Sequence, residues 1–384
     1  MKIVVAMDSF KGTLSANEAC EIVARAIGEC VPARRSVSEG GPSAEIVIKP
    51  MADGGEGTAQ AMMAAGGGRW IKKTVMGPLP EMKVEAGFGW FEKDKSAVVE
   101  MAAASGIELL SGEQMNPMKT TTYGTGQLID DVIVYGAKRL LLAVGGSATV
   151  DGGVGAAMAL GWKFLDWQGN SIPLGGGSLQ QIAKIVAPSK AGNVPVEVLC
   201  DVDNPLCGEH GAARVYGPQK GATPEMVEAL EKGLEHLAEA VREQLGIEIK
   251  NVPGGGAAGG LAAGALAFMN GKLVSGIETV MQCCGLGIEV KSADWVITGE
   301  GCFDQQSLYG KVVAGVSRLA VQSGVCVVVL AGQVNIAKEE YQAIGISDAI
   351  GCKSEDESID YAMRNCRELL YAAAQRFARK YLCG

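Results

Sequence analysis

Carboxylates beside glycines follow five of the apolar runs in this sequence. The loops are DSFKG (8–12), ADGGEG (52–57), VGGSATVDGG (144–153), CDVDNP (200–205) and TGEGCFDQQ (298–306). Asp and Gly are common turn residues, so any one of these loops is more simply explained as a turn. Ligands of open α/β sheets bind outside the carboxyl ends of the strands. Five acidic, glycine-bearing loops of this kind therefore favour an active site that holds cations.

The loop GGSATVDGG connects an expected strand, RLLLAV, to an expected helix, GVGAAMALG. Free backbone N–H groups at a helix N-terminus, with Ser147 and Thr149 beside them, suit a carboxylate or phosphate oxygen. Close packing of strand on helix is the alternative reading of the same glycines.

Three lysines stand beside these loops: Lys11, Lys220 and Lys311. Carboxylates for Mg²⁺, glycine N–H groups for phosphate and lysines for charge are the parts that phosphoryl transfer needs. The sequence contains no GxxxxGK[ST] motif, which excludes a standard P-loop enzyme. For each lysine alone, a solvated surface position is an equally good explanation.

A second glycine-rich segment predicts a different activity. Gly254, Gly256 and Gly259 satisfy GxGxxG after an expected strand, IEIKNV (247–252), and Glu278 follows about 20 residues later, as in dinucleotide-binding proteins. A lone GxGxxG is a weak signal, and small residues in an Ala/Gly-rich helix also permit close packing. An NAD-dependent enzyme is thus an alternative that the sequence leaves open.

Composition excludes several classes of protein. A His-based metal site or a Ser-His-Asp triad would have to use His210 or His236, the only histidines, and both read better as structural residues. The net charge of −9 argues against nucleic acid or an anionic membrane surface as the main partner. No apolar run reaches the length of a membrane span. The eleven cysteines are scattered, which predicts reduced thiols and a cytoplasmic protein.

The order of expected elements predicts an α/β fold with two domains. Apolar strands at 2–7, 45–51, 293–301 and 325–332 alternate with helices, which implies a parallel sheet covered on both faces. Ser15 and Glu18 have the spacing of a capping box at the start of the first helix, and a long helix is expected over 358–382. The middle of the chain differs: residues 83–100 read as a hairpin, and an amphipathic helix runs from Pro224 to Gly246. We therefore expect a discontinuous Rossmann/flavodoxin-like domain (1–68 plus 286–384) with a second α/β domain (69–285) inserted into it.

With these residues in view, the sequence resembles the type I glycerate kinases, close to end to end. The matching stretches are DSFKGTLSA (8–16), ADGGEGT (52–58), TTYGTGQLI (121–129), GGSATVDGGVGAA (145–157), CDVDNPLCGEHGAARVYGPQKGA (200–222), PGGGAAGGL (253–261) and ITGEGCFDQQSLYGK (297–311). The resemblance implies a two-domain enzyme that transfers the γ-phosphoryl of ATP to D-glycerate, usually at the 2-hydroxyl, in a cleft between the domains. The chain departs from the family pattern at Cys302-Phe303, which affects local packing and charge.

From the family match we assign candidate roles. Asp201 or Asp203 is the expected acceptor of the hydroxyl proton, and Lys11 and Lys311 complete the expected catalytic set. The expected metal ligands are Asp53, Glu56, Glu300 and Asp304. The expected contacts to substrate or phosphate are Asp8, Ser9, Gly54, Gly55, Gly145, Gly146, Ser147, Thr149, Asn204, Lys220 and Gln306.

Three functions remain to be distinguished. Besides a kinase that needs ATP and Mg²⁺, these are an NAD-dependent oxidoreductase of a small hydroxy acid and a non-catalytic sensor of glycerate-like acids. The alternative product of the kinase is 3-phosphoglycerate. Oligomeric state, nucleotide preference, pathway and the choice among the carboxylates stay open.

Overall fold

The computed structural model describes residues 1–31, 44–189, 194–308, 311–354 and 356–383. The fold is α/β, with parallel strands in both of its main sheets. The chain forms two compact units. The first contains residues 1–53, 60–67 and 277–384, and the second contains residues 54–59 and 68–276. The boundary at residues 276/277 lies nine residues before the expected one at 285/286. The short segment 54–59 belongs to the second unit, whereas the residues on both sides of it belong to the first.

The first unit is built on a five-stranded sheet in which every pair of strands is parallel. Its strands are β1 (Lys2–Met7), β2 (Glu45–Ile48), β11 (Trp295–Gly299), β13 (Cys326–Ala331) and β15 (Asp348–Gly351), in the order β15-β13-β11-β1-β2. Numbered within the unit, this is the flavodoxin-like order 2-1-3-4-5. The order reverses beside β1, between its neighbours β2 and β11, and such a switch point is where these sheets bind ligands.

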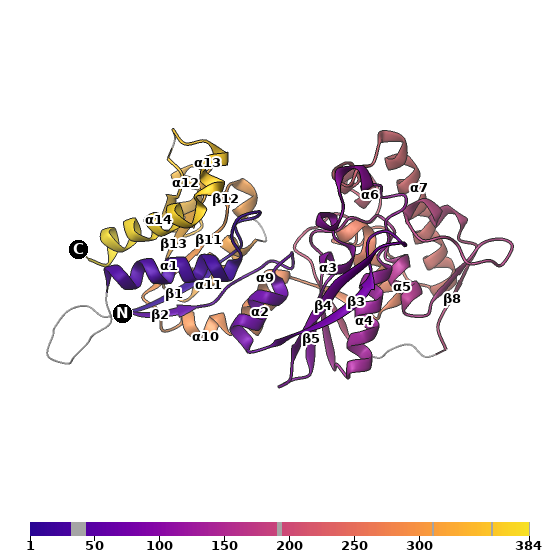
Figure 1. Cartoon of the computed structure of the whole chain (residues 1–384), viewed down its shortest axis with the longest axis horizontal. Helices are drawn as coiled ribbons and strands as arrows, with labels where there is room; N and C mark the ends of the chain where they lie inside the picture. The colour runs from indigo at the N-terminus through magenta and orange to yellow at the C-terminus, as the bar shows by residue number, and fades with distance from the viewer. Residues whose placement is uncertain (32–43, 190–193, 309–310, 355, 384) are drawn as a thin grey trace. The chain divides into compact units, whose positions relative to one another are not determined.

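Helices cover both faces of this sheet, because its strands are apolar on both faces. On one face, α1 (Ala16–Cys30) and α14 (Cys366–Tyr381) pack side by side over Ile3, Val5 and Met7 (Figure 1). On the other, α11 (Val312–Gln322) contacts β11 and β13. The expected capping box at the start of α1 is confirmed, with Ser15 and Glu18 satisfying each other's backbone amides.

Smaller elements complete the unit. They are α2 (Thr58–Gly66), α9 (Gly276–Cys283), α10 (Leu286–Val290), α12 (Lys338–Ala343), α13 (Ile359–Arg364) and the strand pair β12 (Cys302–Phe303) and β14 (Gln333–Val334). The single helix expected over 358–382 is wrong in one respect, because it breaks into α13 and α14 at Asn365. The Asn365 side-chain amide donates to the carbonyl of Tyr361 at 2.8 Å, and such a local bond competes with helix continuation.

The second unit has a mixed six-stranded sheet in the order β10-β9-β6-β5-β4-β3. Its strands are β3 (Arg69–Met76), β4 (Lys83–Phe91), β5 (Ser96–Glu100), β6 (Arg139–Ala143), β9 (Val196–Leu199) and β10 (Gly271–Val274). The antiparallel pairing of β4 with β5 confirms the expected hairpin. From β5 to β10 the strands are parallel, so their carboxyl ends meet at one edge.

The helices of this unit are α3 (Ala102–Ser105), α4 (Tyr123–Tyr135), α5 (Val154–Ala159), α6 (Ala212–Tyr216), α7 (Pro224–Leu245) and α8 (Leu261–Phe268), with a small antiparallel pair, β7 (Lys163–Leu165) and β8 (Lys184–Val186). The amphipathic helix α7 has its expected limits: Thr223 caps its start and Gly246, in a left-handed conformation, ends it. On it, Nε2 of His236 hydrogen-bonds the carbonyl of Ile182 at 2.7 Å, in keeping with a structural residue.

The GxGxxG segment is not preceded by a strand, so that expectation is wrong. Residues 246–249 have no regular structure, and the chain turns into α8 through a short 3₁₀ segment at Ala257–Gly260. A Cβ on Gly259 would lie 1.9 Å from the carbonyl oxygen of Thr149, and one on Gly256 would lie 2.3 Å from that of Pro205. These glycines let two backbones pack closely. Because no strand precedes them, the segment lacks the strand-turn-helix context that a dinucleotide-binding motif requires.

Two further observations bear on the class of protein. All eleven cysteines have free thiols. Among the described residues, none of the helices is both long and apolar enough to cross a membrane.

Candidate active site

Two carboxylates lie at the switch point of the first unit's sheet. Asp8 directly follows β1 and Glu300 directly follows β11, and these strands are neighbours. The amide of Asp8 donates to the carbonyl of Gly299 at 2.8 Å, which carries the pairing to the ends of both strands. Asp53, from the loop that follows β2, acts electrostatically on both carboxylates. The sheet thus brings together three residues that are 45 to 292 positions apart in sequence.

The carboxylates of this group oppose one another's ionisation. The pKa of Asp8 is raised to about 7, mainly by burial and also by the charges of Asp53 and Glu300, against the opposing effects of the Ser9 amide and Lys11. The pKa of Glu300 is also raised, mainly by burial and in part by Asp304 and Asp53. A bound cation would relieve this repulsion.

The remaining predicted residues of this unit surround the pair. Lys11 is exposed and favours the ionised form of Asp8, and Lys311 does the same for Glu300. Asp304 accepts from the amide of Gln306 at 2.9 Å and so shapes the loop after β12. The neighbouring Tyr309 and Gly310 of the YGK segment lie outside the described residues.

Carboxylate oxygens of this group suit Mg²⁺. One oxygen of Glu300, Oε1, is buried and has no hydrogen-bond partner among the described residues. Within the described part of the chain, no three His, Cys, Asp or Glu side chains are grouped closely enough to form a complete metal cage. Mg²⁺ typically takes one or two protein carboxylates and completes its shell with water and substrate phosphates. One or two of Asp8, Asp53 and Glu300 therefore fit a Mg²⁺ ion that is carried in with a nucleotide.

Glu56 does not belong to the same unit as Asp8, Asp53 and Glu300. It belongs to the second unit, is exposed, and acts electrostatically on Glu100, the last residue of β5. Glu100 accepts from the amides of Ala59 at 2.6 Å and Gly57 at 3.3 Å. It therefore anchors the ADGGEG loop, a role that was not predicted from the sequence.

Two predicted glycine loops of the second unit contact each other through their backbones. The amide of Gly145 donates to the carbonyl of Gly54 at 3.3 Å, and a Cβ on Gly145 would lie 2.5 Å from the Cα of Gly55. Gly54 has a φ of +94° and packs on Leu199 at the end of β9. Only glycine permits backbones to approach this closely.

The turn at Gly145–Ser147 presents two free amides. Gly146 is exposed with a φ of +73°, and neither its N–H nor that of Ser147 has an acceptor in the part of the chain that is described. Successive free amides in a turn form an anion-binding concavity. The helix after this loop, α5, begins at Val154, within one residue of its expected start at Gly153. The free amides of Gly146 and Ser147 therefore belong to the turn, and the expectation that they lie at the helix N-terminus is wrong.

The two candidate bases of the CDVDNP loop differ in surroundings. Oδ1 of Asp201 accepts from Ser275 Oγ at 2.8 Å and from the amide of Gly276 at 3.0 Å, at the start of α9. Asp203 is exposed. Asn204 is held on both sides, since its Oδ1 accepts from the Tyr216 hydroxyl at 2.6 Å and its Nδ2 donates to the carbonyl of His210 at 2.9 Å.

Lys220, expected to contact phosphate or carboxylate, is only 2 % exposed. Its Nζ donates to Ser147 Oγ and to the carbonyl of Thr149, each at 2.7 Å. The ammonium therefore lies behind the glycine turn and contacts the loop itself.

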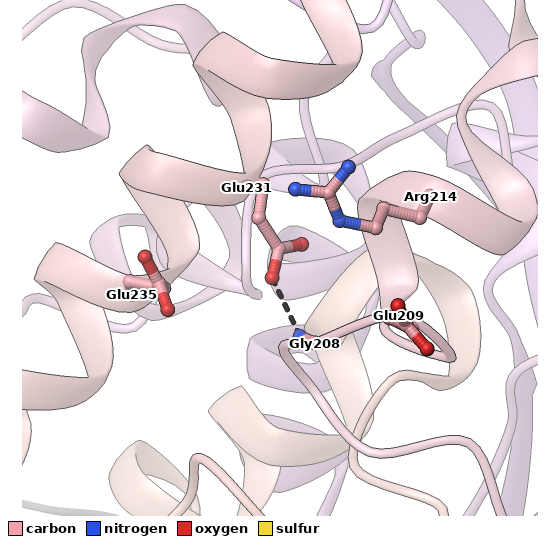
Figure 2. Close-up of a pocket in the computed structure, with 5 residues that line it drawn as sticks. All are labelled: Gly208, Glu209, Arg214, Glu231 and Glu235. Carbon is pink, nitrogen blue, oxygen red and sulfur yellow. Dashed lines mark hydrogen bonds between the residues drawn. The ribbon is translucent and has the colours of Figure 1, made fainter.

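A pocket of about 680 Å³ lies elsewhere in the second unit, next to α7 (Figure 2). It is lined by Gly208, Glu209, Arg214, Glu231 and Glu235. Glu231 accepts from the amide of Gly208, and the guanidinium of Arg214 pairs with Glu228. None of the predicted site residues lines this pocket, and its carboxylates disfavour an anionic ligand.

Known proteins resemble this chain over its whole length. The family model described as "Glycerate kinase family" matches residues 3–382. A glycerate kinase of Halalkalibacterium halodurans is 43% identical over 98% of this chain and 97% of that protein. A glycerate 2-kinase of Escherichia coli is 39% identical over 100% of this chain and 99% of that protein.

A solved structure agrees with these relatives. The crystal structure of a proposed glycerate kinase 2 from Salmonella typhimurium LT2 superposes with a TM-score of 0.85 at 38% identity, covering 100% of this chain and 99% of that one. The chain belongs to the glycerate kinase family.

Proposed function

We propose that this protein is an ATP-dependent glycerate kinase that phosphorylates the 2-hydroxyl of D-glycerate, giving 2-phosphoglycerate and ADP. The observation that carries the proposal is the coupled group of Asp8, Asp53 and Glu300 at the switch point of the parallel sheet, in a chain that belongs to the glycerate kinase family. Phosphoryl transfer depends mainly on positioning and on neutralising charge, and this group supplies ligands for the neutralising cation.

One or two of the carboxylates of Asp8, Asp53 and Glu300 would hold Mg²⁺, which supplies charge neutralisation at the phosphates of ATP. The ionised state of Asp8 is the state able to ligate a cation, and burial raises its pKa to about 7. Lys11 and Lys311, which already favour the ionised carboxylates, would add positive charge near the phosphates.

In the second unit, the free amides of Gly146 and Ser147 would bind an anionic group, either the glycerate carboxylate or a phosphate. Asp203 is the better candidate for accepting the proton of the attacking hydroxyl, because it is exposed while one oxygen of Asp201 already accepts two hydrogen bonds. A base must lie within hydrogen-bond reach of the proton that it removes.

We place the enzyme in the cytoplasm, on the support of eleven free thiols, which reducing compartments preserve.

A single assay tests the function. The purified chain is incubated with ATP, Mg²⁺ and D-glycerate, ADP release is followed, and the product is identified by ³¹P NMR. We expect ADP release that requires both glycerate and Mg²⁺, and a 2-phosphate resonance. A 3-phosphate product would overturn the choice of hydroxyl, and no ADP release at any pH or metal would overturn the kinase assignment. Glycerate-dependent reduction of NAD would support the oxidoreductase instead, and binding without turnover would support the sensor.

A further inference from the structure

We propose that Lys220 is a positioning residue: its buried ammonium fixes the hydroxyl of Ser147 as a hydrogen-bond donor toward the anion bound at Gly146 and Ser147. The inference deepens the proposed function and rests on it, because the anion is taken to be a group of a substrate.

The first step is the direction of one hydrogen bond. Lys220 Nζ lies 2.7 Å from Ser147 Oγ and 2.7 Å from the carbonyl oxygen of Thr149. An ammonium can only donate, so Ser147 Oγ must accept this bond. The hydrogen of the hydroxyl then points away from Lys220 and is available to a ligand.

The second step is the place of Ser147 in the turn. Ser147 is 9 % exposed as a whole residue, and its backbone amide, like that of Gly146, has no acceptor among the described residues. The neighbouring carbonyl of Gly146 accepts from Ile107, and the amide of Ala148 donates to Ser105. These bonds fix the backbone on both sides of Ser147, so its amide and hydroxyl can serve the same anion.

The third step is the electrostatic environment of the buried Lys220 ammonium. Asp151 acts on Lys220 electrostatically and favours the ammonium, whereas burial lowers the lysine pKa to about 7. Asp151 is itself held by amides of Thr122, Gly153 and Gly155 and by the Thr122 hydroxyl. Burial raises the pKa of the Asp151 carboxyl, while these hydrogen bonds favour its ionised form and fix its position from two segments of the chain.

Lys220 is too deeply buried to contact a substrate directly, since it is only 2 % exposed. Its effect on an anion therefore passes through Ser147. Removal of the lysine should therefore weaken anion binding only while the Ser147 hydroxyl is present, so the effects of the two substitutions should not be additive.

The experiment is a double-mutant cycle with the full chain. Ser147→Ala, Lys220→Met and the double variant are compared with wild type by the KM and kcat of each substrate, with Ser147→Thr as the control that keeps a hydroxyl. We expect each single change to raise the KM of one anionic substrate about tenfold, as loss of a charge-assisted hydrogen bond would. The double variant should lie within about threefold of the single variants, where independent effects would multiply to about a hundredfold. Multiplicative effects, or an unchanged KM in Lys220→Met, would overturn the proposal.

A second measurement covers the case in which Lys220→Met does not fold. Above a pH of about 7 the neutral amine can accept a hydrogen bond, so the Ser147 hydroxyl can turn back to it. The KM ratio of Ser147→Ala to wild type should therefore fall toward one between about pH 6 and pH 8, roughly one unit on either side of this pKa. A constant ratio would reject the role of the lysine.

A third readout needs no turnover and separates this inference from the proposed function. Hydrogen–deuterium exchange of the peptide 144–153 should be faster in Lys220→Met than in wild type. If wild type releases no ADP, the proposed function fails whatever the exchange shows. If wild type is active and the cycle is additive, only the role of Lys220 fails.

Discussion

At the scale of single residues, the molecule buries carboxylates whose ionised form burial disfavours. Asp8 has a pKa raised to about 7, and Glu300 has a buried oxygen without a partner among the described residues. Perturbed carboxylates of this kind cluster at functional sites, because selection keeps them for chemistry and not for stability. Replacing such a carboxylate by a neutral side chain should therefore raise the stability of the protein and lower its activity.

We expect Asp8→Asn to be more stable than wild type at pH 8 in the absence of metal, and much less active. The native pKa of about 7 exceeds the ordinary value of 3.8, so the native state binds more protons than the unfolded state between these values. The free energy of unfolding of wild type thus falls as pH rises from about 4 to 7. Asparagine lacks this penalty, and the gain should be about 1 to 3 kcal/mol at pH 8.

Urea unfolding at pH 4 and pH 8 measures this difference, which should disappear at pH 4. Turnover with Mg²⁺ should fall by about a hundredfold or more, as for other charge-stabilising groups. Equal stability of the two proteins at pH 8 would contradict the assignment of Asp8.

Asp203→Asn should affect catalysis alone, whereas Asp201→Asn should also affect thermal stability. Loss of a general base at position 203 should lower kcat by about a hundredfold or more while the midpoint of thermal unfolding stays within a degree or so. Asp201→Asn weakens the bonds to Ser275 and Gly276 and should lower thermal stability as well. Steady-state kinetics and calorimetry on both variants decide the assignment, and near-normal kcat in Asp203→Asn would remove it as the base.

At the scale of elements, the sequence predicted what depends on near neighbours. The capping box of α1, the limits of α7 and the β4–β5 hairpin rest on residues close in sequence, and all three are confirmed. The strand expected at 247–252 is absent and the last helix breaks at Asn365, because tertiary packing and one side-chain amide override the local pattern.

The candidate site was predictable only in its parts. Acidic and glycine-rich loops after strands marked Asp8, Glu300 and the turn at Gly145, but contacts between loops far apart in sequence could not be inferred. Glu100 was missed because its strand read as half of a hairpin. Its parallel pairing with β6, which puts Glu100 at the carboxyl ends of the parallel strands, is set by the sheet.

The contact between glycine loops predicts a steric penalty. In Gly145→Ala the new Cβ would lie 2.5 Å from the Cα of Gly55, so one backbone must move. We expect a loss of about 1 to 3 kcal/mol in unfolding free energy, together with weaker substrate binding. Gly112→Ala is the matched control, because its Cβ would meet nothing within 4 Å. If urea unfolding gave the same stability for both variants, the contact would be unimportant.

The anchoring of the ADGGEG loop by Glu100 makes a parallel prediction. Glu100→Ala leaves the amides of Gly57 and Ala59 without their acceptor and should cost about 1 to 3 kcal/mol. Glu56→Ala, at an exposed position of the same loop, should change stability by no more than about 0.5 kcal/mol. Comparable losses in the two variants would argue against an anchoring role.

At the scale of the whole molecule, the chain passes from one unit to the other four times, at residues 53/54, 59/60, 67/68 and 276/277. The first unit is therefore assembled from distant segments. Its strand β1 pairs with the central strand β11, and the backbone amide of Lys2 donates to Asp294 at 2.6 Å. Such non-local pairing is characteristic of slow folding.

This interrupted connectivity has a consequence during synthesis on the ribosome. Once Gly276 has emerged, the nascent polypeptide contains every residue of the second unit, whereas β1 still awaits three of the strands of its sheet. Limited proteolysis of stalled nascent chains should yield a resistant fragment near 68–276 and rapid cleavage within 1–53. Until β11 has been synthesised, the side of β1 that pairs with it has no partner strand, and the amino-terminal segment that carries Asp8 is the natural substrate for chaperones.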